Sequence, residues 1–292
     1  MDWFRSLLFV PGNREDMLAK AATLQADALV PDMEDSVPEK EKEHARQVVR
    51  QAVKSLAQKG QTVIPRINAL DTGLAKDDLS AVVSPEVYGV TVGKVGSAWD
   101  VQEVSRILDG LERQAGMTIG HTRLIPWLES ARGIVNAYQI AVASPRVVAV
   151  AFGAEDFTND MAVQRSEEGT EIAYPRASVA VAARAAGVLA LDTPYVNFRD
   201  AEGLKREIGS VLRLGFKGKF AIHPGQLEAI NTMFSPSPQE IEYARRVVAA
   251  IEEAEARGSG ATSLDGRMID APVVKRARNL LALAESMERR RG

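Results

Sequence analysis

The sequence of 292 residues contains no cysteine and only three histidines, His44, His121 and His223. Without cysteine, the chain forms no disulfide, no thiolate metal site and no cysteine nucleophile. So few histidines also argue against a histidine-rich zinc site. The metal ligands that remain are carboxylates, which suit a hard divalent cation such as Mg²⁺.

A strong net charge and long hydrophobic runs are missing as well. The chain has 36 basic and 39 acidic residues, so its formal net charge of −3 gives no broad attraction to nucleic acid or to an anionic membrane. The apolar stretch before Pro11 is interrupted by Arg5 and is too short for a membrane span or a signal-peptide core. We therefore expect a cytoplasmic protein without nucleic-acid or membrane partners.

Eight short apolar runs recur along the chain, and several lack polar alternation, as strands buried on both faces do. Segments with helical spacing separate them, so the alternation predicts an α/β fold of the (β/α)₈ TIM-barrel type. A doubly wound open sheet is the alternative, but no G-x-G-x-x-G follows the first run. The predicted strands are Ser6–Val10, Ala28–Pro31, Val63–Ile67, Tyr88–Val92, Leu124–Leu128, Val147–Phe152, Val188–Leu191 and Phe220–Ile222. The predicted helices include Glu39–Lys59, Ser97–Ala115, Ser130–Ala143, Ile172–Ala186 and Asp200–Leu214.

The pattern changes after Pro236-Ser-Pro238. A charged helix, Gln239–Arg257, is followed by a Gly-rich turn and by a last helix that ends near Glu288. These segments are outside the eightfold alternation. We therefore predict a catalytic barrel over residues 1–234 and a C-terminal helical extension over residues 235–292.

Polar residues follow almost every predicted strand. In such a barrel the loops after the strands form the working face. Any one of these residues alone is explained by a helix cap or a surface ion pair, but their convergence favours a functional site. They are Asp32, Glu34, Asp35, Arg66, Asn68, Lys94, Glu129, Glu155, Asp156, Asp192 and His223.

Two of these carboxylates suit a magnesium site. Glu129 and Asp156 follow neighbouring apolar runs, and Mg²⁺ is usually held by one or two carboxylates together with water and substrate oxygens. Glu129 also starts a helix, where a carboxylate is favoured by the helix dipole. Glu155 is adjacent to Asp156 and should point elsewhere, so only one of the two is expected to be a ligand.

Two cations and an acidic turn accompany these carboxylates. Arg66 offers a rigid guanidinium for a carboxylate or a developing oxyanion, and it would also pair with the acidic turn after the second strand. Lys94 is a candidate for an anionic substrate, a solvated lysine, or a Schiff-base lysine of a metal-free aldolase. The acidic residues Asp32, Glu34 and Asp35 either join the metal site through water, hold a cationic side chain, or form an exposed acidic turn.

Seven segments of the chain resemble the citrate lyase beta-subunit and malyl-CoA lyase family of barrel C–C lyases. The resemblance spans nearly the whole chain and departs at Gly93-Lys94, where the family often has Pro-Lys. It implies that Glu129 and Asp156 bind Mg²⁺, that Arg66 steadies enolate or keto-acid oxygens, and that a neighbouring subunit supplies Asp270 as a catalytic acid/base. The segments are Arg5–Gly12, Asp32–Val37, Pro65–Asn68, Pro126–Gly133, Phe152–Phe157, Ala221–Pro224 and Asp265–Pro272.

The resemblance implies a homotrimeric or hexameric, Mg²⁺-dependent lyase. Its substrate would be a 3-hydroxyacyl-CoA such as citramalyl-, malyl- or citryl-CoA, and its products acetyl-CoA and an oxo acid. One alternative is a citrate lyase beta subunit acting on an acyl-carrier-protein thioester within a complex. Another is a metal-dependent aldolase for free hydroxy keto acids. The predicted catalytic residues are Arg66, Asp270 and Glu34, and the predicted substrate-binding residues are Arg66, Lys94, Arg5 and Asp35.

Overall fold

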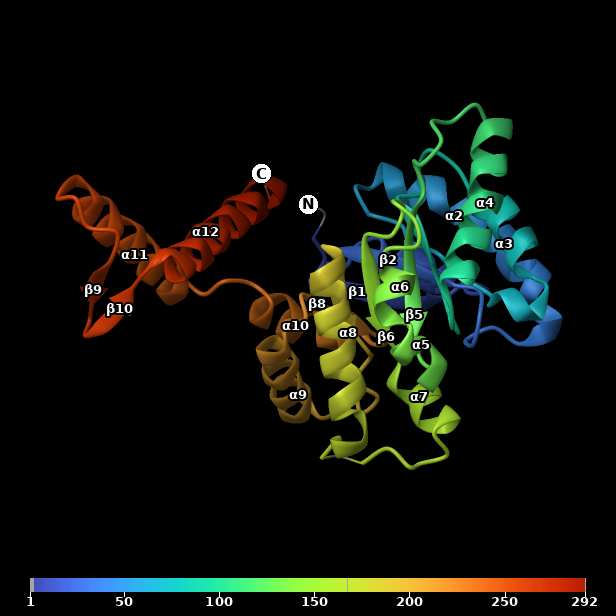
Figure 1. The fold of residues 1–292 in the computed structure, drawn as a ribbon. Helices are drawn as coiled ribbons and strands as arrows, with labels where there is room; N and C mark the ends of the chain where they lie inside the picture. Colours follow the sequence, from blue (N-terminus) through green and yellow to red (C-terminus); the bar gives the residue numbers. More distant parts are fainter. Residues whose placement is uncertain (1–2, 167, 292) are drawn as a thin grey trace. The chain divides into compact units, whose positions relative to one another are not determined.

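A computed structural model of the chain describes residues 3–166 and 168–291. Eight parallel strands pair in sequential order, and β8 pairs with β1 to close a barrel (Figure 1). The predicted TIM barrel is therefore confirmed. The barrel strands are β1 (Ser6–Pro11), β2 (Ala28–Asp32), β3 (Arg66–Ile67), β4 (Gly89–Val92), β5 (Arg123–Leu128), β6 (Ala149–Phe152), β7 (Leu189–Asp192) and β8 (Gly218–Ala221).

Helices follow the barrel strands and cover the outside of the sheet (Figure 1). The predicted helix Ser130–Ala143 is divided at Asn136, whose side-chain amide donates to the Gly96 carbonyl at 2.8 Å. The α-helices that accompany the barrel strands are α1 (Glu15–Ala21), α2 (Lys42–Gln58), α3 (Ala75–Val82), α4 (Ala98–Gln114), α5 (Ala131–Val135), α6 (Ala137–Ala141), α7 (Ala154–Asp160), α8 (Ala173–Ala186), α9 (Ala201–Leu214) and α10 (Leu227–Met233). Short 3₁₀ helices are η1 (Glu39–Glu41), η2 (Leu70–Thr72), η3 (Thr170–Ile172) and η4 (Pro224–Gln226).

Alternate residues of the strands fill the barrel interior, as the two-residue period of a strand requires. Near the carboxyl ends of the strands the filling is aromatic: Phe9 and Phe220 stack at 5.2 Å between ring centroids, and Trp127 lies 4.4 Å from Phe220. The indole N–H of Trp127 donates to Thr91 Oγ1 at 2.6 Å, so this buried polar group is satisfied. We call the open end of the barrel, at the carboxyl ends of the strands, the mouth. These rings form an aromatic floor beneath it.

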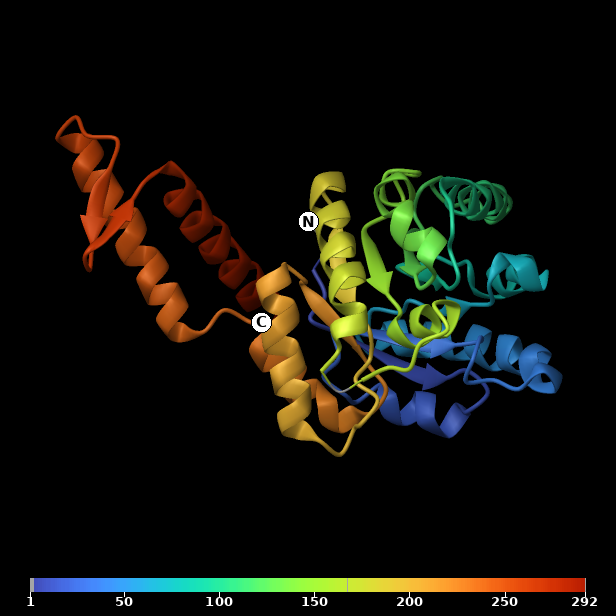
Figure 2. The ribbon, with the colours of Figure 1, turned by 60° about the horizontal axis from the view of Figure 1, so that its bottom comes forward.

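The chain divides into two compact units, Met1–Thr232 and Met233–Gly292. The second unit contains α11 (Pro238–Ala256), β9 (Thr262–Leu264), β10 (Arg267–Ile269) and α12 (Ala271–Arg291), drawn in orange to red in Figure 2. The hairpin between the helices was not predicted, although Asp265-Gly266 is a typical hairpin turn and both residues have positive φ. Across the residues that the structure describes, no helix combines the length and the apolar character needed to cross a membrane.

Candidate active site

Arg66 is the first residue of β3, and carboxylates at the end of β2 and in the turn after it bind its guanidinium group. Its Nε donates to Asp32 Oδ1 at 2.6 Å and its Nη2 donates to Asp32 Oδ2 at 2.7 Å, while Nη1 donates to Asp35 Oδ2 at 3.0 Å. Burial would raise the pKa of Asp32, but the Arg66 guanidinium holds it below its ordinary value. The guanidinium also lies 4.6 Å above the ring centroid of Phe9. The expected pairing with the acidic turn exists, and it fixes the cation on the aromatic floor.

Lys94 stands just beyond β4 with a left-handed backbone, at φ 57°. Its amide donates to Glu129 Oε1 at 2.5 Å. Its Nζ lies 3.0 Å from Glu34 Oε1 and 3.5 Å from Asp35 Oδ1. Burial would lower the pKa of Lys94, but these carboxylates hold it above its ordinary value. The amine is therefore protonated at neutral pH, which disfavours the Schiff-base alternative because only a neutral amine is nucleophilic.

Three carboxylates gather beside these cations. Burial raises the pKa of Glu129 to about 8, and the nearby charges of Asp156 and Glu34 add to the effect. Burial also raises the pKa of Glu34, although Arg66 opposes the change. The pKa of half-buried Asp156 is raised by burial and then by the charge of Asp35. The mouth therefore holds more carboxyl groups than its cations, Arg66 and Lys94, can pair with, and burial disfavours the charged form of the remainder.

This donor set fits a magnesium ion. All the donors are carboxylate oxygens, and buried Glu34 Oε2 accepts no hydrogen bond from the described residues, although it lies 3.1 Å from Arg66 Nη1 in an ion pair. Within residues 3–166 and 168–291, no group of three or more His, Cys, Asp or Glu side chains is arranged to hold a metal. A cation bound by Glu129 and Asp156 would thus depend on water and substrate for its other ligands, which is the coordination that Mg²⁺ accepts.

The structure also distinguishes between the carboxylates that follow β6, which the sequence alone could not tell apart as metal ligands. Glu155 forms an ion pair with Arg165. The charge of the adjacent Asp156, in contrast, is close enough to Glu129 to raise the pKa of that carboxyl group. Exposed Asp160 accepts a hydrogen bond from the Ala131 amide at 2.7 Å, and so caps α5. Of the two adjacent carboxylates, only Asp156 is left without an ion pair to Arg165, and its role as a metal ligand stays a prediction.

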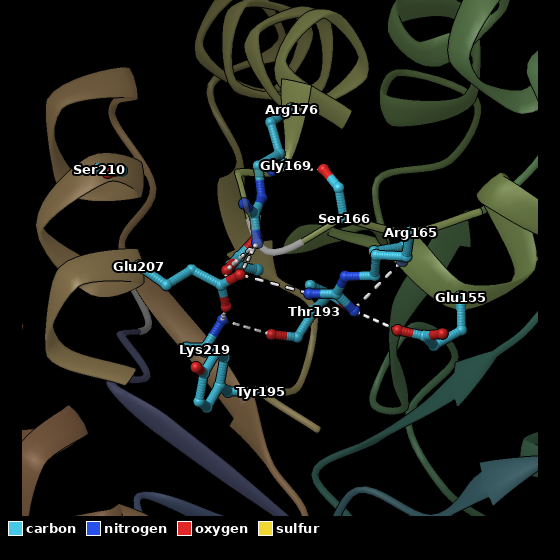
Figure 3. Close-up of polar contacts among 12 residues, drawn as sticks. Glu155, Arg165, Ser166, Gly169, Arg176, Thr193, Tyr195, Glu207, Ser210 and Lys219 are labelled. Atoms are coloured by element: carbon cyan, nitrogen blue, oxygen red, sulfur yellow. Dashed lines mark hydrogen bonds and ion pairs between the residues drawn. The ribbon is translucent and has the colours of Figure 1, made fainter. Parts of the chain in front are cut away.

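Asp192 belongs to an ion network with Lys219 and Arg176, and Figure 3 shows how these two cations converge with Glu207. Asp192 Oδ2 accepts from Lys219 Nζ at 2.5 Å, and its Oδ1 accepts from Arg176 Nε at 2.9 Å. Glu207 accepts a second bond from Lys219 at 2.6 Å and is also contacted by Arg165. We call these five residues the β7–β8 network. The network fixes helices α8 and α9 to the strands and lies outside the group of carboxylates at the mouth.

His223 and Asn68 make local structural bonds. His223 lies directly before Pro224, and its Nδ1 accepts from the Gly225 amide at 3.1 Å and so caps η4. Asn68 Nδ2 donates to Asp78 Oδ2 at 2.6 Å and to the Met33 carbonyl at 2.9 Å. Neither side chain needs a substrate to satisfy these bonds.

Arg5 is not brought together with the other predicted site residues. It immediately precedes β1, at the amino end of the strand, and its guanidinium donates to both carboxylate oxygens of Asp27, at 3.0 and 2.7 Å. Its position therefore gives no support to the predicted substrate-binding role. Arg5 instead ties the beginning of β1 to the segment before β2.

Asp270 lies in the second unit, directly before α12. Its Oδ1 accepts from the Val273 amide at 3.3 Å, so within its own chain it acts as a helix cap. The role of Asp270 in a neighbouring subunit stays a prediction.

Two glycines were missed as parts of the site. Gly93 and Gly153 come directly after β4 and β6, and both lie against the carboxylate of Glu129. The sequence signal was available, since each glycine ends an apolar run, and glycine there often marks a close approach of other atoms.

Comparison with known proteins assigns this barrel to a family. A profile of the HpcH/HpaI aldolase/citrate lyase proteins matches residues 5–224, and the chain therefore belongs to that family. It is an enzyme of the citrate lyase beta-like, oxo-acid lyase type. The resemblance seen in the sequence is thus confirmed.

Three relatives indicate the range of this family. The chain is 40% identical to citrate lyase subunit beta of Leuconostoc mesenteroides subsp. cremoris over 282 residues, which cover 97% of this chain and 93% of the relative. It is 36% identical to (3S)-malyl-CoA thioesterase of Cereibacter sphaeroides over 284 residues, covering 97% and 95% of the two chains. CitE from Mycobacterium tuberculosis, solved with magnesium, acetoacetate and coenzyme A, has a TM-score of 0.78 and 30% identity, and covers 96% of this chain and 97% of its own.

Proposed function

We propose that the chain is a Mg²⁺-dependent lyase that cleaves a 3-hydroxyacyl-CoA, such as citramalyl-, malyl- or citryl-CoA, into acetyl-CoA and an oxo acid. The main support is the cluster of three carboxyl groups with raised pKa values, Glu34, Glu129 and Asp156, beside a fixed arginine. The relative from M. tuberculosis was solved with magnesium, an oxo acid and coenzyme A, which are the components of such a reaction.

Each side chain at the mouth has a role in this proposal. Glu129 and Asp156 hold the cation, which when bound supplies Lewis-acid stabilisation for the oxygens of the oxo acid and the enolate. Arg66 binds the carboxylate of the acid or the oxygen that gains negative charge. Because Asp32 and Asp35 already fix its guanidinium, little reorganisation is needed as that charge forms. Lys94 adds a second positive charge for an anionic substrate.

Cleavage requires two proton transfers. A base removes the proton of the substrate hydroxyl, the electrons of the C–C bond pass into the thioester to form an enolate, and an acid then protonates the enolate carbon. Glu34 is the candidate base, since burial raises its pKa and so favours proton uptake, and its Oε2 accepts no hydrogen bond from the described residues beyond its ion pair with Arg66. Asp270 of a second copy of the chain is the candidate acid.

The test is a panel of malyl-, citramalyl- and citryl-CoA incubated with the purified chain, with Mg²⁺ and with EDTA. Release of acetyl-CoA from one member, lost with EDTA and restored by Mg²⁺, is the expected result. Release that continues in EDTA would contradict the metal requirement. No release from any member, by protein that binds Mg²⁺, would contradict the proposed substrate class.

A second candidate is a beta subunit that acts on an acyl-carrier-protein thioester within a citrate lyase complex. The observation in its favour is the 40% identity, over nearly the full length of both chains, to a citrate lyase subunit beta. Cleavage of citryl thioester on a carrier protein, with no cleavage of citryl-CoA, would favour this candidate. Cleavage of a free hydroxy keto acid, without any thioester, would instead identify an aldolase.

A further inference from the structure

The carboxylate of Glu129 lies in a slot between two glycines. A Cβ built on Gly93 would lie 2.9 Å from Glu129 Oε1, and a Cβ built on Gly153 would lie 2.7 Å from Glu129 Cβ. Both distances are shorter than real Cβ atoms tolerate. A side chain at either glycine would therefore force Glu129 to move.

The glycines are required here by space and not by backbone conformation. Gly153 has φ −109°, which any residue adopts, and Gly93 is absent from the positive-φ residues of the described chain. Gly93 also lies against a second carboxylate, because its Cβ would be 2.9 Å from Glu34 Oε1. The missing side chain thus leaves room for two carboxylates to converge.

The third wall of the slot is the backbone of Lys94. Its left-handed φ of 57° is unfavourable for a residue with a side chain, yet this conformation aims the amide at Glu129 Oε1, 2.5 Å away. A backbone amide cannot change rotamer, so it holds the carboxylate more rigidly than a side-chain donor would.

We infer that Gly93, the Lys94 amide and Gly153 fix the direction of the Glu129 carboxylate and thereby set the affinity of the site for a divalent cation. None of the three is a ligand itself, so they are positioning residues. The inference rests on the proposed metal site. Loss of groups that orient a metal ligand typically weakens metal binding about 10- to 100-fold.

The first experiment measures Mn²⁺ affinity from the EPR signal of the free ion, with the full chain and without substrate. We expect Gly93→Ala and Gly153→Ala to weaken Mn²⁺ binding by about 10- to 100-fold. The matched control is Gly96→Ala on the same loop, where the nearest contact of the added Cβ is the flexible side chain of Arg132, at 3.3 Å. Its affinity should stay within about twofold of the wild type, since a flexible side chain can move aside. Thermal unfolding checks that each variant is folded.

Lys94→Gly keeps the inference testable if the alanine variants do not fold. Glycine retains the amide and removes the backbone strain, while a positive charge beside Glu34 and Asp35 is lost. We expect this variant to bind Mn²⁺ at least as tightly as the wild type. A tenfold loss would show that the side chain, and not the amide, supports the site, and would overturn this part of the inference.

The outcomes separate the inference from the proposed function. If the wild type binds no divalent cation, the proposed metal site itself is wrong. If the wild type binds Mn²⁺ and both Gly93→Ala and Gly153→Ala bind it equally well, only the slot is wrong. Equal weakening by Gly96→Ala would also overturn the inference, because the effect would then belong to the loop in general.

Discussion

Two buried groups of charges in the barrel differ in how well they are balanced. In the β7–β8 network, burial would raise the pKa of Glu207, but Lys219 and Arg176 lower it to about 2. At the mouth, burial and neighbouring carboxylates raise the pKa of Glu129 to about 8. Both carboxylates are largely shielded from solvent, so the number of cations beside them makes the difference.

The comparison distinguishes structural charge from functional charge. A buried carboxylate with matched cations holds the fold together and needs no further partner. A buried cluster with too few cations is costly to the isolated protein and is relieved by a bound cation, so such perturbed groups favour a functional site. Substitutions in each group of charges therefore have different expected effects on activity and on stability.

Removing a carboxylate at the mouth should abolish activity without weakening the fold. We expect Glu129→Gln or Asp156→Asn to reduce Mg²⁺-dependent cleavage more than about 100-fold, since the loss of a ligand should exceed the loss of a group that only orients one. The free energy of unfolding should be unchanged or higher, because burial already disfavours the charged form of both carboxyl groups and the amides carry no charge. Urea denaturation and the acetyl-CoA assay measure the two effects.

Glu155→Gln is the control for Asp156→Asn, because Glu155 is adjacent in sequence but pairs with Arg165. It should retain most of the activity. Full activity in either Glu129→Gln or Asp156→Asn would remove that residue from the metal site.

Breaking the β7–β8 network should have the opposite result for stability. Lys219 is fully buried between Asp192 and Glu207, so Lys219→Met leaves two buried carboxylates without their shared cation. We expect a loss of about 3–5 kcal/mol in the free energy of unfolding, measured by urea denaturation. A loss below about 1 kcal/mol would mean that this network contributes no more to the free energy of unfolding than ordinary surface ion pairs do.

The network should also make the protein sensitive to acid. The pKa of Glu207 falls from an ordinary value of 4.5 to about 2 on folding, so its contribution to stability is complete above pH 4.5 and is lost as the pH approaches 2. The contribution is on the order of 3 kcal/mol. Unfolding free energies measured between pH 6 and pH 3 should fall less steeply in Glu207→Gln, and identical slopes would contradict this interpretation.

A divalent cation should stabilise only a chain with an intact mouth. At a Mg²⁺ concentration of 100 times the dissociation constant, binding to the folded state adds about 2.7 kcal/mol. We therefore expect Mg²⁺ to raise the melting temperature of the wild type and of Glu155→Gln, but not of Glu129→Gln. Calorimetry measures the three melting temperatures. An equal rise in all three proteins would mean that the cation binds elsewhere.

The strands and most of the candidate site could be predicted because each depends on local sequence. Buried parallel strands are unbroken apolar runs, and the residue that ends such a run must lie at the carboxyl end of the barrel. Arg66, Lys94 and Glu129 were found in this way. The same rule argues against a place for Arg5 at the mouth, since Arg5 precedes its strand.

Other assignments needed contacts between distant segments. Asp192 ends a strand just as Glu129 follows one, yet Lys219 and Arg176 neutralise it from the outer side of the sheet. Glu155 and Asp156 are neighbours in sequence, and only the position of Arg165 separates their roles. Polarity and spacing are the same in each case, so the sequence alone gave no basis for a choice.

The alternation of strands and helices, the family, and the set of carboxylates and cations available to the mouth can all be read from the amino-acid sequence. Those properties follow from hydrophobic pattern and residue type, which are local. The tertiary structure decided which charges are matched and which are in excess, because the pKa of a buried group depends on partners brought near by folding. It also decided that Gly93 and Gly153 lie against Glu129, since such contacts depend on packing between strands and not on the order of residues.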